Sequence, residues 1–134
     1  MASSIEFQAF FRGIGGTGWQ SNGSSISMPG SFLQAIQVRL VNPWPFAVIT
    51  YDVHSIKAGW LGSVSGDNLA GNTINPNDYL DSLCIDISNR PPGFIASLNI
   101  VYKVQTQGVW GLEKKNGSST KQGQGIEGIQ IFLQ

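Results

Sequence analysis

The sequence predicts an all-β fold with pseudo-threefold symmetry, because one residue pattern occurs three times within 134 residues. Each copy joins an aromatic-rich strand to a Gly-Trp step, a polar turn and an apolar strand. The tryptophans of this step are Trp19, Trp60 and Trp110, which are 41 and 50 residues apart, in or near the period of known repeat architectures. Three copies without distinct capping units favour a closed object over an open solenoid.

Strands are expected throughout, because apolar residues recur at every second position, as in Ile5-Phe7-Ala9 and Ile129-Ile131-Leu133, which places them on one face of a strand. No window of about eleven residues keeps the apolar period of a helix without an interrupting Gly or Pro. The expected strands are 5–12, 17–21, 24–28 and 33–41 in the first copy, 48–55, 59–64, 69–74 and 79–87 in the second, and 97–105, 109–115, 118–122 and 126–133 in the third.

Two architectures accommodate twelve strands in three related units. A β-prism stands three four-stranded sheets around an axis, whereas a β-trefoil closes six strands into a barrel capped by three hairpins. The long apolar strand that ends each copy favours the prism, and the trefoil is the alternative. Proline-containing links at 42–46 and 89–93 flank the second copy. A single domain of three repeats is therefore expected, with bounds at about 1–42, 43–91 and 92–134.

The composition favours hydrogen-bonded and aromatic recognition over ion pairing. Charged residues make up 12% of the chain and the formal net charge is zero, against a usual charged share of roughly 25%. A basic footprint for nucleic acid is therefore absent, and the available groups suit neutral polyols such as sugars. Glycans or glycoconjugates are the expected partners, and a homo-oligomer is left open.

The sequence contains no expected membrane span, since its apolar stretches are far shorter than the ~20 residues that a membrane helix requires. Met1 to Ser4 lack the basic and apolar regions of a signal peptide. The localisation is left open, with action outside the cell or after non-classical release as the expectation. The single cysteine, Cys84, excludes an internal disulfide.

Catalytic motifs are absent from the sequence, and an enzyme, a metal site and a cofactor are not expected. The only histidine is His54, and no nucleophile elbow or His-Glu-x-x-His helix accompanies it. Alternation along its strand predicts that the imidazole lies on the face opposite Val53, exposed or bonded locally.

The three tryptophans have two interpretations. In the first, Trp19, Trp60 and Trp110 fill equivalent corners of the core, where their area stabilises the fold. In the second, their indole faces stack on sugar rings. Trp44 lies in a proline-flanked link outside the repeat and is expected to behave differently.

Gln34, Asp81 and Glu127 occupy the same place in the three copies, at the start of the last strand. A carboxylate or amide there is able to accept hydrogen bonds from two adjacent sugar hydroxyls. The alternative is a strand residue that faces solvent.

The second copy resembles the clostridial hydrophobic repeat with a conserved tryptophan, at Val53-His54, Gly59-Trp60, Ala70-Gly71-Asn72-Thr73 and Leu80-Asp81-Ser82-Leu83. The other two copies match in part. The first carries Gln34 where the family favours an acid, and in the third Val109 precedes Trp110. This resemblance implies a bacterial extracellular protein with a cell-surface or polysaccharide-binding role.

Asp78-Tyr79-Leu80-Asp81-Ser82-Leu83 is similar to a segment of the jacalin-related β-prism lectins. That resemblance implies that Asp81 accepts hydrogen bonds from sugar hydroxyls, with Tyr79 as its neighbour. The function expected from the sequence is therefore a lectin that recognises cell-surface glycans through repeated shallow sites. The alternative is a receptor-binding or membrane-targeting component of a protein toxin.

Overall fold

A computed structural model describes residues 3–89 and 99–134, and within these ranges the chain forms strands, turns and loops without a helix. The long strands are β1 (Ser4–Phe11), β5 (Leu33–Val41), β6 (Val48–Ser55), β10 (Leu80–Ser88), β11 (Ile100–Thr106) and β14 (Gly128–Leu133). The short strands are β2 (Gly15–Gly16), β3 (Gln20–Ser21), β4 (Ser25–Ser27), β7 (Gly59–Trp60), β8 (Val64–Ser65), β9 (Ala70–Gly71), β12 (Val109–Trp110) and β13 (Lys114–Lys115).

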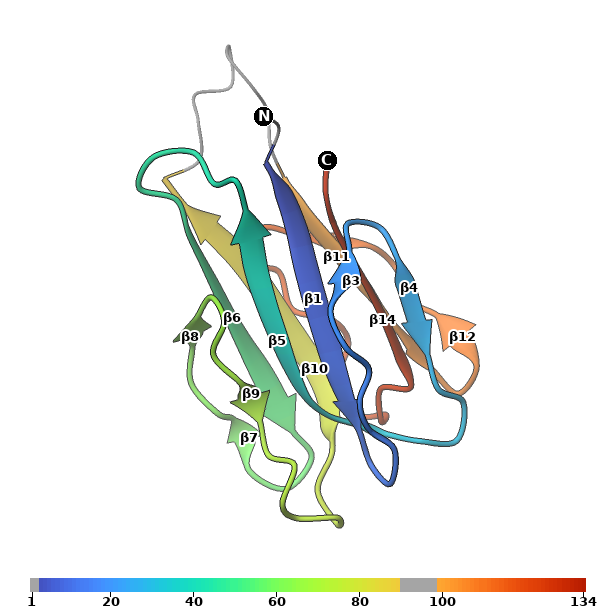
Figure 1. Cartoon of the computed structure of the whole chain (residues 1–134). Helices are drawn as coiled ribbons and strands as arrows, with labels where there is room; N and C mark the ends of the chain where they lie inside the picture. Colours follow the sequence, from blue (N-terminus) through green and yellow to red (C-terminus); the bar gives the residue numbers. More distant parts are fainter. Residues whose placement is uncertain (1–2, 90–98) are drawn as a thin grey trace.

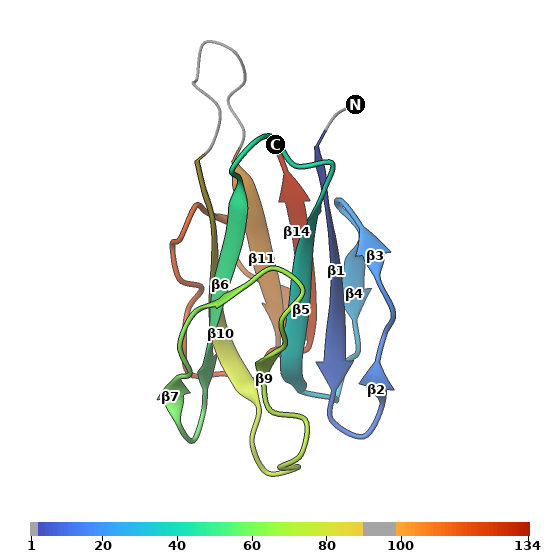
Figure 2. The same ribbon diagram turned by 60° about the vertical axis from the view of Figure 1, so that its left-hand side comes forward.

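The long strands form three antiparallel pairs, β1 with β5, β6 with β10, and β11 with β14. Each pair is the centre of one sheet, and the sheets surround a common axis (Figures 1 and 2). Neighbouring sheets meet where β5 lies against β6, β10 against β11, and β14 against β1. The predicted all-β fold is confirmed, and its three separate sheets are the arrangement expected of a prism.

All three first strands run in the same direction. β1, β6 and β11 point down in Figure 1, and β5, β10 and β14 return upward. The tight turns that follow β1, β6 and β11 therefore lie together at one end of the molecule, called the hairpin end below. The link at 42–46 lies at the opposite end, and the second link falls at 89–93, of which residues 90–93 are outside the described residues.

Each sheet is completed by a segment of the next copy, in a cyclic exchange. β9 of the second copy pairs with β5 of the first, and β4 of the first copy pairs with β14 of the third. In the third copy, Gly117 and Thr120 donate backbone N–H groups to the carbonyl oxygens of Ile85 and Leu83 in β10. Residues 117–120 thus take the place that β4 and β9 hold in the other copies.

The exchanged segments cover the first residues of β5 and β10, so that both faces of these strands are buried there. Gly71 has a φ of 118°, and a Cβ at this position would lie 2.2 Å from the backbone oxygen of Gln34, so only glycine permits so close a crossing. Residues 33–36 and 80–83 are all buried, although the sequence pattern predicts alternation. The polar side chains of Gln34 and Asp81 consequently lie inside the structure.

The core lies between the three sheets and is built from the alternating apolar residues, as predicted. Its largest side chains include Phe7, Tyr51 and Tyr102, which are at most 1% exposed and hold equivalent register positions on β1, β6 and β11. Burying a phenol requires a partner for its hydroxyl. The Tyr51 hydroxyl donates to the carbonyl of Asn68, and the Tyr102 hydroxyl donates to that of Ser118.

The prediction that the repeat tryptophans are core anchors is wrong. Trp60 is 39% exposed, and Trp19 and Trp110 are half-buried. Strand pairing explains this outcome, because Trp60 lies opposite His54 and Trp110 opposite Gln105. These strand positions alternate with the core positions of β6 and β11, so the indoles lie on the outer faces of their sheets.

Two further expectations concern the link and the second strands. Trp44 was expected to behave differently from the repeat tryptophans, and it packs against the core from its link and donates its indole N–H to the carbonyl of Asn89. The second strand of each copy was expected as one element. In its place the second and third copies have two strands of two residues each, and in the first copy the range 17–21 contains only β3, with β2 just before it. Glycines at 18, 62 and 111 lie in these interruptions.

At the hairpin end, three equivalent residues meet near the axis. Phe32, Tyr79 and Gly125 each precede the buried first residue of a long apolar segment. The rings of Phe32 and Tyr79 lie 4.4 Å apart between centroids, with the Arg12 guanidinium 5.1 Å and 5.8 Å from them. A Cβ on Gly125 would lie 2.6 Å from the Phe32 ring. Two aromatic rings and one glycine therefore cover this end of the core.

Burial raises the pKa of the Tyr102 phenol to about 12. An unfolded tyrosine titrates near pH 10. The un-ionised Tyr102 phenol therefore contributes fully to the free energy of unfolding below pH 10, and this contribution is lost as the pH rises towards 12, by about 3 kcal/mol in total. We expect Tyr102→Phe to cost about 1 kcal/mol at pH 8 through the lost hydrogen bond. Urea unfolding at pH 8 and 11 measures the difference between wild type and variant, which should shrink or change sign at pH 11. An equal difference at both values would contradict the assignment.

Candidate functional site

The strand-start residues Gln34, Asp81 and Glu127 are structurally equivalent, as the sequence predicts. Each follows the first buried residue of a long apolar segment, namely Leu33, Leu80 or Ile126. Backbone hydrogen bonds from Leu33 to Ile126 and from Ile126 to Leu80 join these first residues across neighbouring copies. Gln34 and Asp81 are 6% and 2% exposed, and Glu127 is half-buried. The alternative that they are strand residues facing solvent is therefore wrong for the first two.

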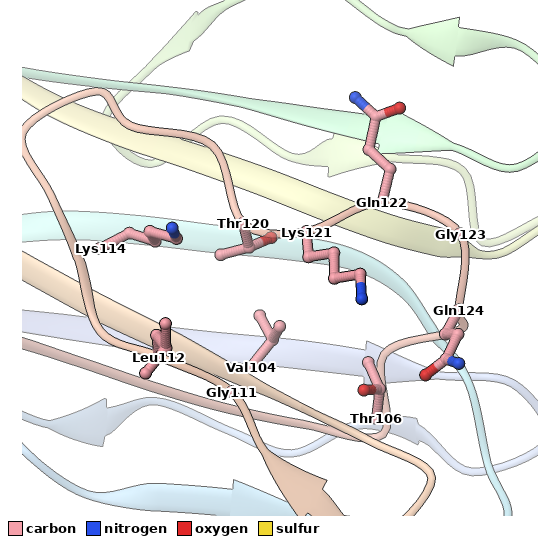
Figure 3. Close-up of a pocket in the computed structure, with 10 residues that line it drawn as sticks. All are labelled: Val104, Thr106, Gly111, Leu112, Lys114, Thr120, Lys121, Gln122, Gly123 and Gln124. Carbon is pink, nitrogen blue, oxygen red and sulfur yellow. The ribbon is translucent and has the colours of Figure 1, made fainter.

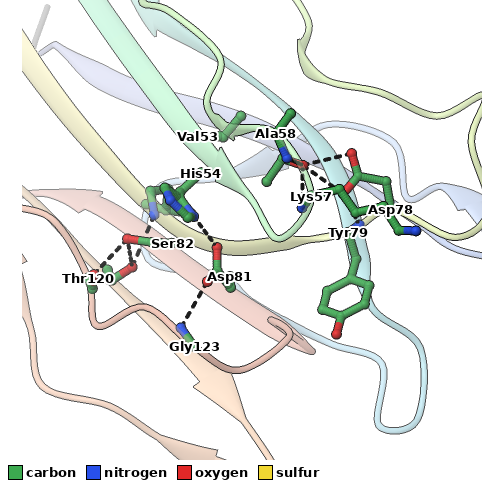
Figure 4. A network of polar contacts seen from close by, with 12 residues as sticks. Val53, His54, Lys57, Ala58, Asp78, Tyr79, Asp81, Ser82, Thr120 and Gly123 are labelled. Carbon is green, nitrogen blue, oxygen red and sulfur yellow. Dashed lines mark hydrogen bonds and ion pairs between the residues drawn. The ribbon is translucent and has the colours of Figure 1, made fainter.

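The Asp81 carboxylate joins two copies of the repeat. Its Oδ1 lies 2.6 Å from His54 Nδ1, and its Oδ2 accepts the backbone N–H of Gly123 at 2.8 Å (Figure 4). Since an ionised carboxylate only accepts hydrogen bonds, Nδ1 carries the imidazole proton in this contact. Ser82 reinforces the junction, because its hydroxyl donates to the carbonyl of Thr120 at 2.6 Å.

Gln34 and Glu127 act on the equivalent loops of the neighbouring copies. The Gln34 side-chain amide donates to the carbonyls of Asn75 and Asp78, at 3.1 and 3.4 Å. The Glu127 carboxylate accepts the backbone N–H groups of Gly30 and Gly108, at 2.9 and 3.1 Å. All three residues therefore fix the loop that returns from an exchanged segment to the next long strand.

Tyr79 does not join Asp81 in one site. Its ring points away from the Asp81 carboxylate (Figure 4) and lies in the axial cluster with Phe32 and Arg12. The lectin-like segment thus supplies one residue that holds a loop and one that covers the end of the core.

The three indoles have different neighbours. The Arg39 guanidinium lies 3.8 Å from the centroid of the Trp19 ring and forms an ion pair with Glu6. His54 meets Trp60 edge-on, with 5.2 Å between ring centroids. Lys103 lies 5.5 Å from the Trp110 centroid.

Trp19 is not equivalent to the other two tryptophans. Hairpin register places Trp60 and Trp110 opposite His54 and Gln105, while the corresponding pair in the first copy is Gly16 and Phe10. A Cβ on Gly16 would lie 2.8 Å from the Phe10 ring. In the first copy, the Phe10 ring therefore occupies space at the position that an indole holds elsewhere.

The outer face of the first sheet carries a hollow of about 620 Å³, within the size range of small-molecule sites. It opens between the first hairpin, β5 and the segment around β9, and is called the first-sheet hollow below. None of its lining residues is ionisable. They are Phe10, Phe11, Gly13, Ile14, Gly15, Gln34, Gln37, Leu69 and Thr73.

A second hollow of about 610 Å³ lies within the third copy, between residues 104–114 and the segment 120–124 (Figure 3). It is called the third-copy hollow below. In contrast to the first, it includes two lysines and no carboxylate. Its lining residues are Val104, Thr106, Gly111, Leu112, Lys114, Thr120, Lys121, Gln122, Gly123 and Gln124.

Several of these lining residues were not singled out from the sequence. Phe10 was interpreted only as the aromatic residue of the first copy's strand, aligned with Tyr51 and Tyr102, whereas strand register gives that place to Phe7. An aromatic residue at an outward position of the alternating strand is the signal that distinguishes Phe10. Lys114 and Lys121 belong to a copy that contains half of the eight basic residues, which is also visible in the sequence. Gln37 and Thr73 carry no comparable signal, since their strand and loop approach one another only through the exchange.

Comparisons with protein-family models, with curated proteins and with solved structures gave no match for this chain. The resemblances to the clostridial repeat and to the jacalin-related lectins therefore stay predictions. Among the described residues, no helix is long and apolar enough to cross a membrane.

We expect Asp81→Ala to destabilise the protein by about 3 kcal/mol, because the Gly123 N–H and the His54 Nδ1–H lose the charged acceptor that the buried Asp81 provides. For a domain of this size, this corresponds to a decrease of roughly 10 °C in the thermal midpoint. Glu113→Ala is the matched control, since it removes a carboxylate from an exposed residue and should cost no more than about 0.5 kcal/mol. Equal midpoints for the two variants would contradict a structural role for Asp81.

Proposed function

We propose that this protein is a carbohydrate-binding protein and that the first-sheet hollow is its best-formed site. The observation that carries the proposal is the lining of that hollow, which combines two aromatic rings, two amides and one hydroxyl without an ionisable group. A neutral sugar needs this combination, since it presents an apolar ring face and a rim of hydroxyls. Apolar walls with a few placed polar groups are general features of ligand pockets.

Each group in the hollow has a separate task in this proposal. The half-buried Phe10 ring offers an apolar surface to the sugar ring. The Gln34 amide nitrogen is already used on the loop at 75–78, whereas its Oε1 accepts no hydrogen bond from the described residues. This oxygen is available to a sugar hydroxyl. Gln37 is fixed by Gln8 and by the carbonyl of Asp67, so its amide is held in place before a ligand arrives.

The equivalent places on the other two sheets support repeated sites with different lining. The second sheet presents Trp60 with the His54 imidazole, and the third presents Trp110 beside Gln105. The repeated aromatic residue therefore supports up to three shallow sites. Of the three strand-start residues, only Gln34 contacts the sugar in this proposal, whereas Asp81 and Glu127 hold loops.

We expect Phe10→Ala to weaken the binding of a neutral glycan about tenfold, through loss of the stacked ring, and Thr73→Val to weaken it about fivefold, through loss of one hydrogen bond. A glycan array identifies the ligand, and titration calorimetry measures the affinities. Phe46→Ala and Thr50→Val are the matched controls, because both make the same chemical change away from the first-sheet hollow.

Binding of no glycan by the wild-type protein would contradict the proposed function. Equal losses for Phe10→Ala and Phe46→Ala, with both variants folded, would contradict the site. The stoichiometry gives the number of working sites, and Trp60→Ala and Trp110→Ala should each remove one site if the sheets act independently.

The second candidate function is membrane targeting as a component of a protein toxin, and one observation favours it. Exposed aliphatic side chains gather at the hairpin end, with Ile14, Ile56 and Val109 at 52%, 39% and 67% exposure. One lies at the turn that follows each of β1, β6 and β11, in the same direction along the axis (Figure 1). Arg12 and Lys57 flank them in the sequence. Apolar tips with basic neighbours suit the interface of an anionic bilayer.

For this candidate we expect the protein to float with anionic phosphatidylserine vesicles, and Ile14→Ser/Ile56→Ser to lower the bound fraction at least about tenfold, because two apolar tips no longer enter the interface. Phe46→Ser is the control, since Phe46 is 87% exposed at the opposite end. Vesicle binding that is equal for all three proteins, or absent for wild type, would rule out this candidate.

A further inference from the structure

We propose that the third-copy hollow binds the anionic group of an acidic saccharide, a carboxylate or a sulfate, through Lys114 and Lys121. This inference rests on the proposed carbohydrate-binding function and adds a second site with a different ligand chemistry. The first-sheet hollow has no ionisable group, whereas the third-copy hollow has two cations and no anion in its lining.

The two lysines reach the third-copy hollow from separate segments. Lys114 belongs to β13, and Lys121 follows the exchanged segment 117–120. Both side chains extend into the space that these segments enclose (Figure 3). Lys114 is half-buried, while the adjacent Lys115 is exposed and does not line the hollow. The strand therefore directs one of two consecutive lysines inward and the other outward.

No carboxylate among the described residues forms an ion pair with either lysine. The nearby acids are committed to other partners or lie outside the hollow. Glu127 accepts two backbone N–H groups, Asp81 is bound to His54 and Gly123, and Glu113 is exposed and does not line the hollow. Two like charges in one hollow repel one another, and an anion between them removes that cost.

The remaining lining suits the rest of a sugar ring. Thr106, Gln122 and Gln124 supply hydroxyl and amide groups, and Val104 and Leu112 supply apolar surface. The wall at 120–124 is fixed to the second sheet, because the Thr120 hydroxyl accepts the backbone N–H of Leu83 at 3.1 Å and Gly123 is held by Asp81. A positioned wall reduces the entropy lost on binding.

The test uses two pairs of polymers, and the members of each pair share a sugar backbone and differ in one anionic group. Polygalacturonate is compared with its methyl ester, which isolates the carboxylate, and dextran sulfate is compared with dextran, which isolates the sulfate. We expect the wild-type protein to bind at least one charged member more tightly than its neutral partner, with an affinity that decreases as salt is added. Lys114→Gln and Lys121→Gln should each weaken this binding about tenfold, while Lys115→Gln, which makes the same change of charge, should weaken it less than about twofold.

The outcomes separate this inference from the proposed function. Equal losses for all three lysine variants would mean attraction to overall surface charge and would overturn the inference. Equal affinity for charged and neutral polymers would also overturn it. In either case, binding of a neutral glycan that is sensitive to Phe10→Ala would leave the proposed function standing. Loss of acidic binding in Lys121→Gln with unchanged neutral binding would support both.

Discussion

The fold depends on the exchange of a short segment between neighbouring copies. None of the three long strand pairs is complete alone, because the outer edge of β5, β10 or β14 needs backbone partners that only the next copy provides. The exchange also forces a returning loop across the start of each of these strands. Gln34 and Asp81 are buried at that crossing and need partners. Together with the half-buried Glu127, they supply the bonds that fix the loops. Closure of the ring therefore links all three copies to one another.

Both hollows lie beside the exchanged segments, and this position has a physical cause. Each returning loop runs from an exchanged segment at the edge of one sheet to the start of the next long strand near the axis, so it does not lie flat on a sheet. Space remains between the loop and the neighbouring hairpin, in the first copy near Thr73 and in the third near Lys121. The residues that hold the loops also hold the hollow walls, so Asp81 acts on the third-copy hollow through Gly123 without lining it.

Much of the fold was predictable from the sequence, because the alternation that marks core residues is visible within each strand. Alternation in Ile5-Phe7-Ala9 assigned the buried face of β1, and the shared polar class identified Gln34, Asp81 and Glu127 as equivalent. The exchange was not predictable, since pairing of β9 with β5 depends on contacts between different copies. Trp19 was aligned with Trp60 by its Gly-Trp dipeptide, but hairpin register places Gly16 there instead. When a Gly-Trp dipeptide is repeated three residues out of register, the sequence alone does not distinguish it from an aligned one, because only the strand pairs fix the register.

The three copies agree where they face the axis and differ where they face outward. Core positions retain Phe7, Tyr51 and Tyr102, because each must fill the same volume against the same neighbours. The outer positions are free of this constraint. They carry two amides and the Glu6–Arg39 ion pair in the first copy, an imidazole and carboxylates in the second, and Lys103 and Lys115 in the third. The two hollows differ in the same way, since one is lined by two lysines without a carboxylate and the other by an uncharged set that includes aromatic rings. Under the proposed function, this divergence gives the copies different ligand groups to bind.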